Sequence, residues 1–117
     1  MSPDRPVFLN LARIRFPVGA VASIGHRISG VLLVLVLPFA VWFLEISLRS
    51  DSISLETGAF VRVGALLLGW AAAHHLFAGI RHLLMDVGVG ASLPAARASA
   101  YAVLIAAAAV ALAAFFL

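Results

Sequence analysis

Residues 74–86 (HHLFAGIRHLLMD) place three histidines, an arginine and an aspartate directly after the apolar run VGALLLGWAAA. Ionisable side chains within a membrane-spanning segment are costly and usually serve a function. On a helix that turns by about 100° per residue, His75, Gly79, His82 and Asp86 form one stripe. We therefore expect this stripe to face a bound group or a neighbouring helix.

His75 is the deeper histidine of the stripe, and His82 lies roughly 10 Å along the axis, near the polar boundary. A neutral imidazole is a common metal ligand, and Gly79 leaves room for a flat group beside the backbone. This pattern suits a haem on edge, with its propionates toward the interface. A six-coordinate haem would need a second axial ligand from a partner. Alternatively, His75 only hydrogen-bonds another helix, and spacing alone leaves both interpretations open.

A second group of polar residues lies in the segment SIGHRISG, where Ser23 and Arg27 are four residues apart and face the same way on a helix. A hydroxyl and a guanidinium can both donate to the carbonyl of a quinone, and Arg27 would stabilise negative charge during reduction. His26 is on the neighbouring flank, where it could face a propionate. The alternatives are a helix cap for Ser23 and an arginine that reaches lipid phosphate for Arg27.

The composition indicates which elements position these residues. The chain has 117 residues, of which 64% are hydrophobic, whereas soluble domains are about 45–50% apolar. An apolar segment of roughly 17–25 residues can cross a bilayer, where it must be helical to satisfy its own backbone. Three stretches of this kind contain no Asp, Glu, Lys or Arg: residues 28–44, 63–80 and 98–117. We therefore predict an all-α integral membrane protein with three transmembrane helices.

The chain is expected to form a single membrane-anchor domain that belongs to a heteromeric helix bundle. Pro38 should kink the first helix, Gly88 and Gly90 should end the second, and Pro94 should mark the start of the third. The N-terminal segment is too polar before its first apolar run to be a cleavable signal peptide, and we expect it to lie along the interface. The predicted segments are an interfacial region at residues 1–20 and helices at approximately residues 22–48, 58–87 and 95–117.

The arginines predict the orientation. Most of them precede the first helix or flank the connection between the second and third, so the positive-inside rule places the N-terminus in the cytoplasm and the C-terminus on the opposite side. The formal net charge of +3 is modest, and we expect no nucleic-acid binding. The absence of cysteine excludes disulfides and thiolate-held iron–sulfur clusters within this chain.

Two blocks of sequence resemble a known family. The segments RPVFLNLARIRFPVGAVASIGHRISG and HHLFAGIRHLLMD are similar to the cytochrome b556 membrane-anchor subunits of succinate dehydrogenase, the large anchor of respiratory complex II. The first matches that family's R-P…S-I-x-H-R-x-[ST]-G block, and the second its H-x-x-x-G-I-R-H-x-x-x-D block. Together they cover about a third of the chain, in the family's order.

The resemblance implies a role for each matching residue. His75 would be the axial ligand of a haem b iron, with the second axial histidine supplied by the small anchor subunit. His26, Arg27 and His82 would lie near the haem propionates. Ser23 and Arg27 would bind the quinone. Ile24 would form an apolar wall of that site, and His74 keeps no assigned role.

The resemblance also implies partners and a location. A flavoprotein subunit with FAD would oxidise succinate, and an iron–sulfur subunit would pass electrons to ubiquinone at the cytoplasmic face. This chain would anchor both in a bacterial-type inner membrane and would perform no dehydrogenation. The alternatives are the anchor of a fumarate reductase that uses menaquinol, an anchor without haem, and, in a different class, a small proton-coupled transporter.

Overall fold

A computed structural model describes residues 14–49 and 59–116, and the described residues form three α-helices without a strand. The helices are α1 (Val18–Arg49), α2 (Ala59–Asp86) and α3 (Leu93–Phe116). Each contains a segment long and apolar enough to cross a membrane. The predicted all-α membrane fold is therefore confirmed.

α1 begins four residues before the expected residue 22, because Pro17 starts the helix. The carbonyl of Pro17 accepts hydrogen bonds from the backbone N–H groups of Ala20 and Val21, at 2.9 and 3.2 Å. Proline suits a helix start, where its missing N–H costs nothing. The expected interfacial segment falls largely on residues 1–13, which lie outside the described residues.

The turn between α2 and α3 is built around Gly88 and Gly90, which have positive φ angles of 85° and 70°. Val89 N–H donates to the carbonyl of Leu84 at 2.8 Å, and Gly88 N–H donates to that of Met85 at 3.0 Å. This pair of bonds is a Schellman motif, which satisfies the last carbonyls of a helix and favours glycine at the left-handed position. The glycines therefore end α2 as predicted.

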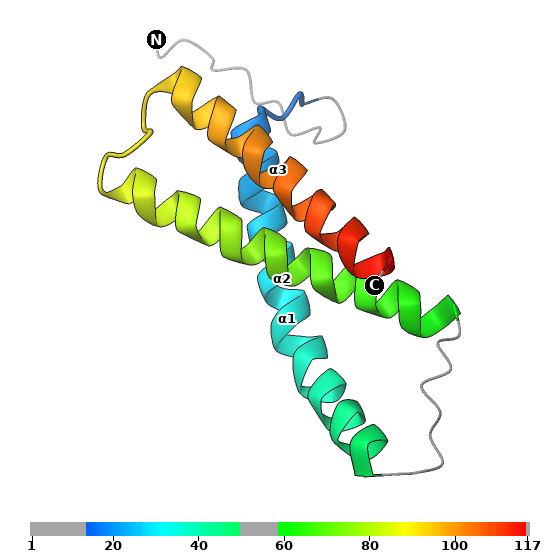
Figure 1. The fold of residues 1–117 in the computed structure, drawn as a ribbon. Helices are drawn as coiled ribbons and strands as arrows, with labels where there is room; N and C mark the ends of the chain where they lie inside the picture. The colour runs from blue at the N-terminus through cyan, green and yellow to red at the C-terminus, as the bar shows by residue number, and fades with distance from the viewer. Residues whose placement is uncertain (1–13, 50–58, 117) are drawn as a thin grey trace, which may run out of the picture.

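α2 and α3 run antiparallel, as Figure 1 shows, and their contact is the most extensive among the three described helices. The buried face of α3 consists mainly of small side chains, which are Ala100, Val103, Ala107 and Ala111. On α2, the small residues Ala71 and Ala78 are also buried. Small residues let helix backbones approach closely, which is how membrane helices gain packing energy without a hydrophobic driving force.

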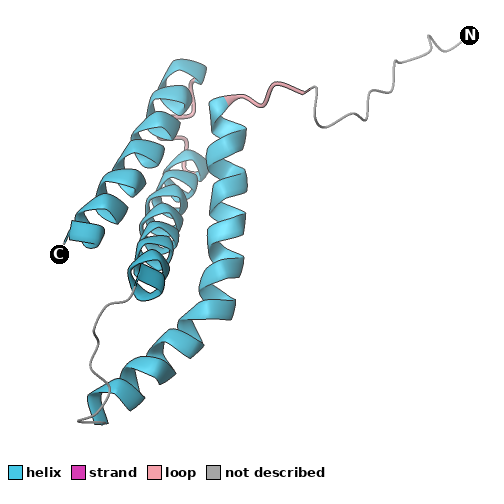
Figure 2. Ribbon diagram, turned by 90° about the vertical axis from the view of Figure 1, so that its right-hand side faces the viewer, coloured by secondary structure: helices cyan, strands magenta, loops and turns pink. Residues whose placement is uncertain are grey.

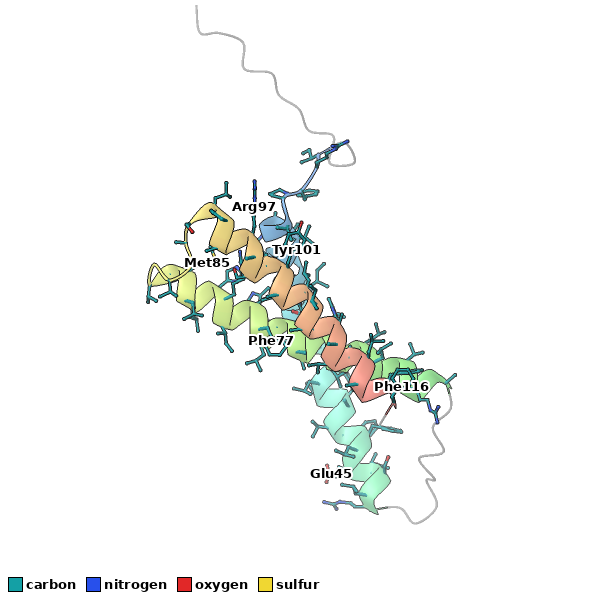
Figure 3. All side chains as sticks on the ribbon, turned by 45° about the horizontal axis from the view of Figure 1, so that its top comes forward. Glu45, Phe77, Met85, Arg97, Tyr101 and Phe116 are labelled. Carbon is teal, nitrogen blue, oxygen red and sulfur yellow. The ribbon has the colours of Figure 1, made fainter. Side chains whose placement is uncertain are left out.

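α1 packs against the other two helices near its N-terminal end and then diverges from them (Figures 1 and 2). Figure 2 shows that α1 is bent, and Pro38 lies inside it. Proline removes one backbone hydrogen bond and kinks a helix. Figure 3 places Glu45 on the diverging part, away from Met85 and Arg97 at the joined ends of α2 and α3.

Candidate functional site

His75 of α2 contacts α1 through one side of its ring. Its Nδ1 lies 3.1 Å from the carbonyl oxygen of His26 and 3.3 Å from the hydroxyl of Ser29. Because a carbonyl only accepts hydrogen bonds, Nδ1 carries the proton and Nε2 keeps its lone pair. Among the described residues, no hydrogen bond reaches Nε2. A histidine that donates one ring N–H to a carbonyl while the other nitrogen stays unprotonated has the arrangement typical of metal ligands.

Gly30 of α1 lets the His75 ring approach this closely. A Cβ atom at Gly30 would lie 2.9 Å from Cε1 of His75, closer than side-chain atoms pack. Ser29, the preceding residue, donates to the carbonyl of His26 at 2.9 Å. Ser29 and Gly30 are the last two positions of the family block in the first segment, but the sequence analysis gave neither of them a role.

An open groove of about 540 Å³ runs along α1 beside His75. Val31, Val34 and Leu35 form its apolar wall, while His26 and Arg27 lie toward its polar end. His75 is therefore at the side of an apolar groove that has a basic edge.

His26 of α1 lies between the two histidines of the α2 stripe. Its ring stacks on that of His75, with centroids 4.2 Å apart and planes 11° apart, and on that of His82, at 5.1 Å and 23°. Gly79 provides the space, because a Cβ there would be 3.4 Å from Nε2 of His26. The sequence predicted that Gly79 would leave room for a flat group, and in the structure the nearest flat group is this imidazole.

Ser23 of α1 meets the other end of the stripe. Its hydroxyl lies 3.3 Å from Nε2 of His82, whose Nδ1 is 2.7 Å from the carbonyl of Ala78, one turn back in α2. A hollow of about 390 Å³ adjoins this pair where the three helices meet. Its polar lining consists of Ser23, Arg81, His82, Asp86 and Arg97.

His74 points into the helix contact instead of the groove. It is 0% exposed, its Nε2 is 3.2 Å from the carbonyl of Ala22, and its ring stacks on Trp70 at 5.2 Å. Gly25 makes room for it, since a Cβ there would lie 2.6 Å from Nε2. Nδ1 is buried without a partner among the described residues. His74 is thus a packing residue between α1 and α2.

Arg81 joins α2 to α3. Its guanidinium donates to the hydroxyl of Ser99 and to the carbonyl of Ala96, both at 3.0 Å, and only 8% of the residue is exposed. The structure therefore buries this arginine as a link between α2 and α3. Arg81 and Ser99 are 18 positions apart in the sequence, and no pattern in the sequence predicted that they would be in contact.

The predicted site residues are brought together in part. His26, His75, His82 and Ser23 form one continuous series of contacts across α1 and α2. Ser23 and Arg27 were expected on a common face, and in the structure they line different hollows, Ser23 the one beside His82 and Arg27 the one beside His75. Arg27 and Ile24 are exposed.

Comparison with known proteins agrees with this architecture. Residues 1–115 match the model of the family described as succinate dehydrogenase/fumarate reductase transmembrane subunit. The chain is 41% identical to a succinate dehydrogenase cytochrome b556 subunit of Coxiella burnetii, over 90% of this chain and 89% of that protein. A protein of the same name from Paracoccus denitrificans is 33% identical, over 86% of this chain and 82% of its own length. The chain therefore belongs to the family of transmembrane subunits of succinate dehydrogenase and fumarate reductase.

Proposed function

We propose that this chain is the large membrane anchor of a succinate:quinone oxidoreductase, in which it holds one side of a haem b and forms part of the ubiquinone-reducing site. Family membership and the three apolar helices support the anchor role. The observation that carries the haem proposal is the position of the His75 ring, whose Nδ1 lies 3.1 Å from the His26 carbonyl, so that in the neutral ring Nε2 has the free lone pair.

The residues around His75 fit a haem. Nε2 would ligate the iron, and the apolar groove of about 540 Å³ beside it would receive one edge of the porphyrin. Arg27 and His26 would meet the propionates at the polar end. The open side of the groove would be closed by the small anchor subunit, which would supply the second axial histidine. When bound, the haem would provide a one-electron redox centre within the membrane.

The quinone site would lie near the N-terminal end of α1, where Ser23, Ile24 and Arg27 lie within about one turn of each other. Ser23 would donate to one quinone carbonyl, and Arg27 would stabilise negative charge that builds on the oxygen during reduction. Ile24, which is 40% exposed, would form an apolar wall. His82 was expected near the propionates, but its Nε2 faces Ser23, so within this proposal it belongs to the quinone side.

The partners would dock on the same end of the bundle. Arg15, Arg27, Arg81 and Arg97 lie toward this end, which makes it the cytoplasmic end by the positive-inside rule. A flavoprotein subunit with FAD and an iron–sulfur subunit would bind there, oxidise succinate and deliver electrons to the quinone. The membrane would be a bacterial-type inner membrane.

The complex purified through this chain tests the proposal. We expect a b-type absorbance in the reduced-minus-oxidised spectrum and succinate-dependent reduction of ubiquinone. A complex without either would refute it, and a proton-coupled transporter would show neither. The family description includes fumarate reductases, so menaquinone and ubiquinone should be compared as acceptors. Faster turnover with menaquinol and fumarate would identify the reverse direction.

A further inference from the structure

Both ring nitrogens of His82 have defined hydrogen-bonding roles. The carbonyl of Ala78 is 2.7 Å from Nδ1 and only accepts hydrogen bonds, so Nδ1 carries the proton of the neutral ring. Nε2 then presents its lone pair to the Ser23 hydroxyl at 3.3 Å. Ser23 therefore donates its hydrogen to His82 in this state.

This arrangement has a consequence for quinone binding. A hydroxyl has one hydrogen, so Ser23 cannot donate to His82 and to a quinone carbonyl at the same time. Protonation of His82 removes the conflict, because Nε2–H then donates to the Ser23 oxygen and the Ser23 hydrogen is free to point at the quinone. The protonation state of His82 thus sets the direction in which Ser23 donates.

We propose that His82 is the positioning partner of Ser23 and supplies the proton that Ser23 passes to the reduced quinone. This inference rests on the proposed quinone site. It places His82 in the quinone chemistry through Ser23, whereas the resemblance implied a role at the haem propionates.

Reduction to the quinol takes two electrons, which succinate supplies through the partner subunits, and two protons. As charge builds on one carbonyl oxygen, the Ser23 O–H bond breaks and an O–H bond forms on that oxygen. The proton on Nε2 of His82 moves to the Ser23 oxygen, which restores the hydroxyl. His82 returns to its neutral form and takes its next proton from water, while the second quinol proton reaches the other oxygen independently.

The surroundings of His82 are compatible with proton entry. The hollow of about 390 Å³ that it lines lies at the end of the bundle where α2 and α3 are joined, and Asp86 and Arg97 at its rim are exposed. The charged or titratable groups that line this hollow or stack on the ring come from all three helices: His26 from α1, Arg81 and Asp86 from α2, and Arg97 from α3. Arg81 is bound to α3 through Ser99. Asp86, four residues after His82 on α2, is the acidic residue that lines this hollow.

The experiment compares Ser23→Ala, His82→Gln and the double variant in the assembled complex. Glutamine can place its amide near the position of Nε2 but cannot carry a proton to Ser23. Leu83→Gln, at a 69% exposed position one residue away, controls for the added amide. Turnover is measured per flavin with succinate and ubiquinone, alongside succinate oxidation by a soluble dye and the haem spectrum.

We expect His82→Gln and Ser23→Ala each to lower kcat for quinone about tenfold, because loss of a proton donor costs at least that much, with KM changed less than about twofold. The double variant should keep at least about half the kcat of His82→Gln, because the losses caused by residues that act as a unit are not additive. Dye reduction and the haem spectrum should stay unchanged. Leu83→Gln should match the unmodified complex.

Two results would overturn the inference. Wild-type turnover in His82→Gln would remove His82 from the reaction, and a hundredfold loss in the double variant would show that the two residues act separately. If Ser23→Ala itself turned over normally, the proposed quinone site would be wrong instead. Should His82→Gln fail to assemble, His82→Asn replaces it, and wild-type turnover in that variant would likewise overturn the inference.

Discussion

His74 and His75 are neighbours in α2, and their rings meet α1 one helical turn apart. His74 faces the carbonyl of Ala22, and His75 faces that of His26. The two rings differ in what lies beyond them: His74 is enclosed by Trp70 and the helix contact, whereas His75 adjoins the groove. At the scale of the residue, a rotation of about 100° separates a packing histidine from a candidate ligand.

This difference predicts opposite outcomes for the two alanine variants. His75→Ala should abolish or shift the b-type absorbance of the complex, because it removes the imidazole whose Nε2 would ligate the haem iron. His74→Ala should retain the absorbance but destabilise the complex by about 2–3 kcal/mol, through the cavity left in the contact. Difference spectra and thermal loss of absorbance measure both effects. Loss of the spectrum in His74→Ala alone would transfer the ligand to that residue.

Arg27 carries the second prediction at this scale. Arg27→Ala should lower succinate:ubiquinone turnover about tenfold or more by removing a charged donor from the site, while dye-linked succinate oxidation remains. Arg49→Ala is the matched control, because the Arg49 side chain is 78% exposed and, within residues 14–49 and 59–116, its ion-pair partner is Glu45, one turn earlier at 2.7 Å. Such surface pairs contribute little, so this variant should behave normally. Equal losses of both activities in Arg27→Ala would indicate failed assembly instead.

At the scale of the element, the approach of α1 to α2 depends on three glycines that face histidines. Gly25, Gly30 and Gly79 each leave a space that an imidazole ring fills. Across this contact, Gly25 faces His74, Gly30 faces His75 and Gly79 faces His26. Because membrane helices associate through close packing, the positions of these glycines set how near α1 lies to the stripe that contains His75 and His82.

A methyl group at two of the glycines should therefore have different effects. In Gly25→Ala the new Cβ would be 2.6 Å from Nε2 of His74, and a ring held between two helices has little freedom to move. We expect a destabilisation of about 1–3 kcal/mol, as for other overpacked sites. Gly64→Ala has nothing within 4 Å of the new Cβ and should be neutral. Thermal denaturation of the purified complex compares them, and equal stability of the two variants would contradict the packing described for α1.

At the scale of the whole molecule, Arg15, Arg27, Arg81 and Arg97 lie toward the end where α1 begins and α2 joins α3, whereas Glu45, Arg49 and Arg62 lie toward the opposite end. The opposite end carries the diverging part of α1 and the C-terminus of α3 (Figure 1). Many apolar side chains along α1 remain exposed, including Val34 at 75% and Phe39 at 70%. In a membrane these faces contact lipid or neighbouring subunits.

The proposed orientation can be tested with single cysteines, because the natural sequence contains none. Val89→Cys lies in the turn between α2 and α3, and Arg49→Cys lies at the end of α1. In intact spheroplasts, a membrane-impermeant maleimide should label Arg49→Cys and leave Val89→Cys unlabelled. Solubilisation in detergent should expose both. Labelling of Val89→Cys from outside would reverse the topology.

The linear order of residues was enough to predict the three membrane helices, their approximate ends and the stripe that contains His75 and His82. These features depend on local rules: a backbone in lipid must satisfy its own hydrogen bonds, and helical periodicity assigns residues to faces. His74 was separated from His75 by the same periodicity. The assignment of haem and quinone residues came from the family resemblance, and it stays a prediction.

Tertiary structure decided which side chains meet across helices. Ser29 beside His75, His82 beside Ser23 and Arg81 beside Ser99 are pairs separated by 46, 59 and 18 residues. Periodicity places each residue on a face of its own helix, but it contains no information on how a second helix is rotated or where it crosses. That geometry arises when small residues and glycines let specific surfaces approach, and it depends on all three helices at once.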